Sequence, residues 1–217
     1  MSLTQTIQEE IADNLDKRRF EITNLHRVLL NYTGKPLEST ALRMAIPLLY
    51  ANWEGYVREV CQLYLEYIES TGVQVRNLKP GLLGYLWTPA LKPLIGGLDF
   101  EKKKIIAELA LNCMENSVHF EDSERAINTK SNLNFDVLKN ISNHLCLETT
   151  TLEPWKQHLN ALVNIRNNIA HGSILTALKY YFFEEHASSL ISLMEEFEKV
   201  IIQTLENNGF CKNTTKI

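Results

Sequence analysis

The sequence predicts an all-α protein, a bundle of about five to seven helices that begins with a long N-terminal helix. Three observations lead to this fold class. Apolar residues recur every three or four positions over most of the 217 residues, as on a helix with one buried face. Glycine and proline stand where these apolar stripes end, as they do at helix ends. Hydrophobic residues make up 45% of the chain, a share that is normal for a globular core.

Two long amphipathic helices are expected first. The first covers residues 3–32 and ends at the Gly-Lys-Pro sequence that begins at Gly34. The second begins at residue 39 or 40, where a serine or a threonine can cap it, and continues to residue 70. Pro47 lies inside this span, so we expect a kink there or a break near Ala45.

The middle of the chain is less regular. Residues 72–98 combine prolines and glycines with many apolar side chains, which indicates short helical turns packed on the body. Asp99 can cap a helix over residues 100–113. Its lysine run at 102–104 is interpreted as a solvated face, with RNA contact as the alternative. Residues 116–134 are polar and expected to form loops.

Three helices are expected in the C-terminal part. Asn134 or Asp136 can open a short helix through residue 145. Pro154 marks the start of the next helix. The aromatic residues 180–183 are interpreted as an extended segment before a last helix over residues 184–207.

The helix after Pro154 contains the stretch around which the chain is organised, LNALVNIRNNIAHGSI at residues 159–174. Its apolar residues recur at helical spacing, and Arg166 lies on or beside the stripe that faces the core. His171 follows at the last turn, and Gly172 offers a helix stop. The sequence therefore places an arginine and a histidine around the end of a mostly apolar helix.

The charge around Arg166 is unusual for this chain. The protein has 26 acidic residues and a net charge of −4, yet residues 154–183 contain no Asp or Glu. An arginine near a core stripe is costly unless an anion meets it, and no acid in this helix can do so. The partner is either a carboxylate from another helix, with Glu54 as the best candidate, or the phosphate of a ligand.

The sequence Arg166-Asn167-Asn168-Ile169-Ala170-His171 resembles the Arg-x4-His signature of the HEPN superfamily, the higher eukaryotes and prokaryotes nucleotide-binding domains. The helix around residues 51–58 (ANWEGYVR) and the Ser-Asn-Leu sequence at 131–133 resemble the stand-alone bacterial HEPN nuclease branch. The resemblance spans about residues 40–205. It implies an up-and-down HEPN-like helical bundle.

The resemblance also implies a function. Many HEPN proteins are metal-independent endoribonucleases of toxin–antitoxin, CRISPR and anti-phage systems, and the expected products carry 2′,3′-cyclic phosphate ends. Arg166 and His171 would be catalytic, with Asn167, Glu54 and Arg58 binding or orienting the substrate. Glu54 can instead pair with Arg58 at the surface, since the two are spaced four residues apart on a helix. Neither a cofactor nor a metal is expected. A homodimer with a composite active site is expected, with RNA as substrate and an antitoxin or defence protein as a further partner.

Three other interpretations stay open. A non-catalytic HEPN-like module would use the same residues to bind a nucleotide, an RNA or a protein. The toxins that a nucleotidyltransferase neutralises carry a tyrosine two residues after the histidine; this chain has Ser173 there, which weakens that interpretation. A purely structural helical bundle would use Arg166 and His171 for stability alone.

The remaining expectations concern organisation and location. We expect one domain over residues 1–217, with a helical arm at 1–38, a core bundle at 39–208 and a frayed tail at 209–217. The sequence does not decide whether the arm joins the core or mediates dimerisation. No apolar run is long enough for a membrane span, and the N-terminus lacks a secretory signal. The four dispersed cysteines indicate free thiols in a cytoplasmic protein, and the histidines lack zinc-site spacing.

Overall fold

The computed structural model describes residues 3–91, 100–121, 127–173 and 178–212. These residues form eight α-helices and two short 3₁₀ helices, and they include no β-strand. The all-α prediction is therefore confirmed. Within the same residues, no helix combines the length and apolar character that a membrane span needs.

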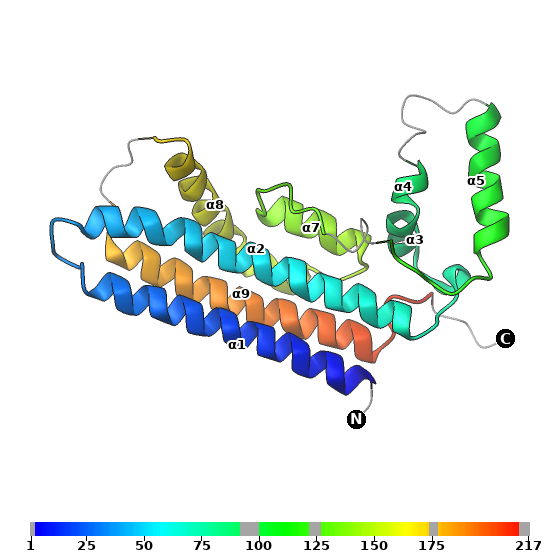
Figure 1. Cartoon of the computed structure of the whole chain (residues 1–217), viewed down its shortest axis with the longest axis horizontal. Helices are drawn as coiled ribbons and strands as arrows, with labels where there is room; N and C mark the ends of the chain where they lie inside the picture. Colours follow the sequence, from blue (N-terminus) through cyan, green and yellow to red (C-terminus); the bar gives the residue numbers. More distant parts are fainter. Residues whose placement is uncertain (1–2, 92–99, 122–126, 174–177, 213–217) are drawn as a thin grey trace.

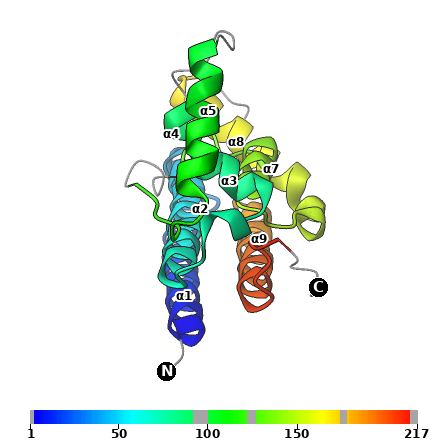
Figure 2. The same ribbon diagram turned by 90° about the vertical axis from the view of Figure 1, so that its right-hand side faces the viewer.

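Three long helices make the body of the molecule: α1 (Leu3–Leu30), α2 (Glu38–Ser70) and α9 (Tyr180–Glu206). Each of the three packs against the other two. Figure 1 shows α2 and α9 running in the same direction and α1 running the opposite way. The end-on view in Figure 2 places α9 beside the stacked α1–α2 pair. Segments from the two ends of the sequence thus share one core.

The apolar stripe of α1 points into this core. Every fourth or seventh residue of the helix is buried, in the set Ile7, Ile11, Leu15, Ile22 and Leu29. The N-terminal helix is thus packed along its length on α2 and α9 of the same chain.

The helix α2 continues through Pro47 without interruption, so the predicted break near Ala45 is wrong. Proline removes one backbone hydrogen bond and crowds the preceding turn. The residues around it compensate, because Ala45, Ile46 and Leu49 are buried in the core and hold both sides of the helix in place. The helix also begins at Glu38 rather than at residue 39 or 40, and no side chain caps it.

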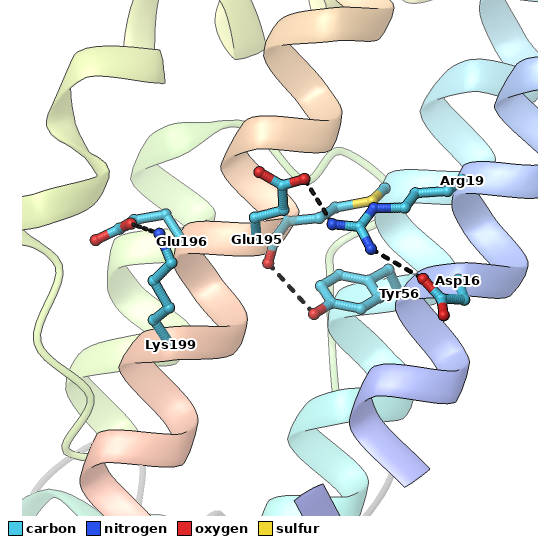
Figure 3. A network of polar contacts seen from close by, with 7 residues as sticks. Asp16, Arg19, Tyr56, Glu195, Glu196 and Lys199 are labelled. Carbon is cyan, nitrogen blue, oxygen red and sulfur yellow. Dashed lines mark hydrogen bonds and ion pairs between the residues drawn. The ribbon is translucent and has the colours of Figure 1, made fainter. Parts of the chain in front are cut away.

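Polar contacts across the body fix the helices relative to one another (Figure 3). Arg19 of α1 donates to Glu195 of α9 over 2.6 Å and to Asp16 over 2.9 Å. Tyr56 of α2 donates from its buried hydroxyl to the carbonyl oxygen of Met194 over 3.3 Å. The ion pairs are partly exposed and contribute little energy, so burial supplies most of the stability and the polar contacts fix the register.

The segment after α2 forms short helices at one end of the molecule, as predicted for residues 72–98 in their described part (Figure 1). These are the 3₁₀ helix Val75–Asn77, α3 (Pro80–Leu86) and α4 (Thr88–Leu91). The helix α5 (Phe100–Cys113) has the predicted bounds and contains no buried residue. Asp99, its predicted cap, lies outside the described residues.

Two further helices lie along the body. The helix α7 (Phe135–His144) begins as predicted at Asn134, whose side-chain oxygen accepts the Val137 N–H over 3.0 Å. A 3₁₀ helix over Thr150–Trp155 contains Pro154 and leads directly into α8 (Lys156–Ala170). The helix α8 packs against both α2 and α9, so the organising stretch of the sequence rests on the core.

The aromatic residues 180–183 are helical, and the prediction of an extended segment there is wrong. They form the first turn of α9, with Phe183 fully buried. No local side chain caps this helix; the carboxylate of Glu38, in the first turn of α2, accepts the Tyr180 N–H over 3.2 Å. The same carboxylate accepts the Gly34 N–H over 2.9 Å, so it links the α1–α2 turn to the start of α9.

Candidate functional site

The end of α8 has a defined geometry. Leu159, Leu162 and Val163 are buried and fix the rotation of the helix. At the C-terminus, Gly172 has a φ of 71°. The Gly172 N–H donates to the Ile169 carbonyl over 3.1 Å, and the next N–H donates to the Asn168 carbonyl over 2.9 Å. This pair of bonds is the Schellman motif, and it confirms the predicted helix stop at Gly172.

Arg166 is half-buried on α8, and its guanidinium group is held on three sides. Its Cζ atom lies 3.8 Å from the ring centroid of Tyr50, a buried residue of α2. Nη2 donates to the Ser131 carbonyl oxygen over 2.8 Å, and Nη1 donates to the Asn167 side-chain oxygen over 2.9 Å. Nε is buried and has no hydrogen-bond partner among the described residues. The plane of the guanidinium group is therefore fixed.

The predicted carboxylate partner of Arg166 is absent from the described part of the chain. Glu54 does not form an ion pair with Arg166 there; its carboxylate instead accepts a short hydrogen bond from the Thr129 hydroxyl. The alternative pair with Arg58 is not formed either, and Arg58 is exposed without an ion pair among these residues. The positive charge of Arg166 is thus surrounded by neutral groups, namely an aromatic ring, a carbonyl and an amide.

Asn167 extends the polar contacts of Arg166 to the loop before α7. Its side-chain nitrogen donates to the Asn132 side-chain oxygen over 3.0 Å, while its oxygen accepts from Arg166. Asn167 therefore holds Arg166 on one side and the loop on the other, while its role in orienting the substrate stays a prediction.

Tyr50 connects the same loop to the ring beneath Arg166. Its hydroxyl oxygen accepts the Leu133 N–H over 2.7 Å. Burial raises the pKa of Tyr50, and the negative charge of Glu54 raises it further, while the Leu133 hydrogen bond and Arg166 lower it. The net effect is upward, so the phenol is neutral near pH 7.

His171 differs from Arg166 in being exposed. It is the C-cap of α8, and its imidazole makes no hydrogen bond or ion pair with another described residue. The imidazole is therefore accessible to a ligand at the end of α8.

Two cavities of about 270 and 330 Å³ lie between α1 and α2 and beside the end of α9. Arg166 and His171 are not among the residues that line these two cavities. Within the described residues, no group of three or more His, Cys, Asp or Glu side chains is arranged to hold a metal ion.

Comparison with known families identifies the fold. The family model described as HEPN_MAE_28990-like HEPN matches residues 7–210. The chain belongs to this HEPN family. The match begins within α1, so the HEPN domain includes the N-terminal helix as well as the bundle. HEPN domains are nuclease and RNA-binding modules. No curated protein and no solved structure matches the chain.

Sequence reasoning missed one member of this HEPN site, Tyr50. A signal was available: Tyr50 lies four residues before Glu54, so the two share a face of α2. The sequence could not reveal that the aromatic ring, rather than the acid, lies beneath Arg166. It did single out residues 131–133, and all three residues of that segment contact Tyr50 or the Arg166–Asn167 pair.

Proposed function

We propose that this HEPN protein is a metal-independent endoribonuclease that uses the 2′-hydroxyl of its RNA substrate as the nucleophile. The observation that carries the proposal is the fixed guanidinium group of Arg166, which has no carboxylate partner among the described residues. A half-buried cation surrounded by neutral groups favours an incoming anion, and a phosphodiester is the anion that RNA offers.

The chemistry needs a proton acceptor and a proton donor. The 2′-oxygen loses its proton and attacks the adjacent phosphorus, the bond from phosphorus to the 5′-oxygen breaks, and the 5′-oxygen gains a proton. The products are a 2′,3′-cyclic phosphate and a 5′-hydroxyl. His171, whose imidazole is exposed at the end of α8, serves as acid or base. Arg166 stabilises the charge that develops on the pentacoordinate phosphate.

A dimer completes this scheme. The reaction needs both a proton acceptor and a proton donor, whereas the Arg166–His171 motif of one chain supplies a single histidine. Two copies that meet across a two-fold axis bring two arginines and two histidines to one site. In this proposal the homodimer acts on cellular or phage RNA in a toxin–antitoxin or defence setting, in the cytoplasm, with an antitoxin or defence protein as a further partner.

The first experiment compares purified wild type with His171→Ala on transfer and ribosomal RNA in the presence of EDTA. Cleavage ends are mapped, and an RNA with a single 2′-deoxy position at a mapped site tests the nucleophile. His144→Ala is the matched control, because His144 is another exposed histidine in the last turn of a helix. We expect cyclic phosphate ends from wild type and the control only. Equal cleavage by His171→Ala would refute the catalytic assignment.

A mixing experiment tests the composite site. Arg166→Ala and His171→Ala are each expected to be inactive alone. If two copies share a site, mixed dimers regain one arginine and one histidine there, and part of the cleavage activity returns. Measured masses verify that the two variants have exchanged subunits. If cleavage activity then does not return, the result argues against a shared site.

The second candidate is a non-catalytic HEPN module that binds RNA, a nucleotide or a protein. It is favoured by the same fixed Arg166, because a bound phosphate needs the cation but no acid or base. This candidate predicts RNA binding that Arg166→Ala abolishes and His171→Ala leaves unchanged, with no cleavage by wild type.

A further inference from the structure

The loop before α7 makes a sharp turn at two residues with left-handed backbone conformations. Lys130 has a φ of 55° and Ser131 a φ of 50°. Residues other than glycine and asparagine rarely adopt this backbone conformation, so the surrounding contacts must hold it in place. One of them is the Lys130 N–H, which donates to the Asn128 side-chain oxygen over 2.9 Å. The turn directs residues 131–133 toward α2 and α8.

These residues, the segment 131–133, contact two helices at once. Arg166 and Asn167 of α8 donate to the first two residues of the segment, and Tyr50 of α2 accepts from the third. The bonds are Arg166 Nη2 to the Ser131 carbonyl at 2.8 Å, Asn167 Nδ2 to Asn132 Oδ1 at 3.0 Å, and the Leu133 N–H to the Tyr50 hydroxyl at 2.7 Å.

We infer that Tyr50 and the segment 131–133 form a positioning clip for Arg166, so that Tyr50 and Asn132 control phosphate binding through Arg166 without touching the RNA. This inference rests on the proposed function for its effect on cleavage. Its effect on the geometry of Arg166 does not depend on cleavage and can be measured separately.

The clip acts on the orientation of a group that is otherwise free to rotate. An arginine side chain has several rotatable bonds, and ordering it costs conformational entropy. The clip fixes the guanidinium plane before the substrate arrives: Tyr50 covers one face of the group, and the segment 131–133 and Asn167 each take one N–H. A guanidinium group has five N–H donors, so others stay available for phosphate oxygens. A donor fixed in advance stabilises the transition state more than one that must reorganise.

Contacts within the core make the clip rigid. The indole N–H of Trp53, a fully buried residue of α2, donates to the Leu133 carbonyl over 3.2 Å. Leu133 therefore bonds to α2 through both its N–H and its carbonyl. Since Tyr50 is itself buried, the clip joins Arg166 to the core and not to a surface loop alone.

The test uses Tyr50→Leu, which removes the ring and the hydroxyl, and Asn132→Ala, which removes the bond to Asn167. Tyr50→Phe keeps the ring and is expected to lie between wild type and Tyr50→Leu. Asn134→Ala is the matched control, because Asn134 is in the same loop but caps α7 through Val137 and has no bond to α8. Melting temperatures of all variants identify any loss of fold.

The first readout is the nuclear magnetic resonance signal of the Arg166 Nε–H in protein with isotope-labelled arginine, assigned with Arg166→Lys. In wild type we expect a resolved signal, because the group is buried beside a ring. It should shift when inorganic phosphate is added. In Tyr50→Leu and Asn132→Ala the signal should move to the position of a free arginine, and phosphate should bind at least several-fold more weakly. In Asn134→Ala it should match wild type.

The second readout is RNA cleavage. A misplaced Arg166 loses contacts that matter most in the transition state, so kcat should fall by about tenfold or more while KM changes little. An unchanged Arg166 signal in Tyr50→Leu and Asn132→Ala overturns the inference. So does a change in Asn134→Ala as large as in Asn132→Ala, which would indicate a general structural role. If wild type does not cleave RNA, the proposed function fails, and the phosphate titration alone decides for or against the clip.

Discussion

Replacing Arg166 by methionine separates a structural role of this arginine from a functional one. Methionine fills the space of the side-chain stem and removes the charge. We expect Arg166→Met to lower the free energy of unfolding by only about 1–2 kcal/mol, whereas breaking a buried salt bridge costs about 3–5 kcal/mol. The reason is that Arg166 has no carboxylate partner among the described residues, so its removal leaves no charge behind.

The magnitude follows from the contacts of Arg166. Stacking on Tyr50 is worth about 0.5–1 kcal/mol at a partly exposed site, and two hydrogen bonds to neutral acceptors add about 0.5–1.5 kcal/mol each. Against this, the substitution removes the cost of a buried Nε–H without a partner, about 1–3 kcal/mol. The balance is a modest loss.

The assay is urea denaturation followed by circular dichroism, together with the rate of RNA cleavage. Removing one charged donor to the transition state is expected to lower cleavage by about 10²–10³-fold, far more than a loss of stability of this size can explain. Arg19→Met is the control: Arg19 pairs with two carboxylates on the far side of the core, and its loss should leave cleavage unchanged. A stability loss above about 3 kcal/mol for Arg166→Met would refute the reasoning, since it would reveal a buried partner charge.

Three further predictions concern stability. Asn134→Ala should cost about 1 kcal/mol in urea denaturation, because it removes the cap of α7. Burial raises the pKa of Glu198, so the folded state holds this proton more tightly and stability falls as pH rises through that pKa. Glu198→Gln should therefore raise Tm at pH 7, with the difference vanishing below about pH 4. Burial lowers the pKa of His186 below 6.5, so the unfolded state binds more protons and stability should fall as pH drops below 6.5. Melting curves of wild type and His186→Phe measure this, and the variant should lose that slope.

For each of these three stability predictions, one measured result would contradict it. Asn134→Asp keeps an accepting oxygen and should retain the cap, so equal losses for both variants at this position would exclude capping as the cause. A lower Tm of Glu198→Gln at pH 7 would mean that the charge is stabilising. An unchanged pH slope in His186→Phe would assign that slope to another histidine.

Local signals in the sequence predicted the parts of the fold that depend on neighbouring residues. The stop of α8 follows from Gly172, because a left-handed backbone there is cheap for glycine. The start of α7 follows from Asn134, whose side chain reaches its own helix. The stripe of α1 follows from helical periodicity alone. In each case the determining contact lies within a few residues.

The errors occur where a distant residue decides. The first turn of α9 was predicted to be extended because it is a short run of aromatic residues. Its N–H group at Tyr180 is accepted by the carboxylate of Glu38, 142 residues away in sequence. The helix α2 passes Pro47 because tertiary packing outweighs a local penalty. Both facts depend on which helices meet, and periodicity does not contain that information.

The candidate site shows the same difference between features set by neighbouring residues and features set by distant ones. Arg166 and His171 were proposed as site residues because their chemistry and spacing are visible along one helix. The sequence left two partners open for Arg166, a carboxylate such as Glu54 or the phosphate of a ligand, because opposite charge was the available guide. The structure places Tyr50 beneath Arg166 instead, and an aromatic ring that binds a cation leaves no pattern in the sequence.

The packing of α9 against both α1 and α2 has a consequence for synthesis. Translation delivers α1, α2 and α8 to the growing chain before α9, the helix that completes the core of the first two and supports the third. Until then the nascent hairpin of α1 and α2 has an uncovered apolar face, and the contacts most distant in sequence form last. The helix that carries Arg166, α8, thus completes its packing only after α9 has been made.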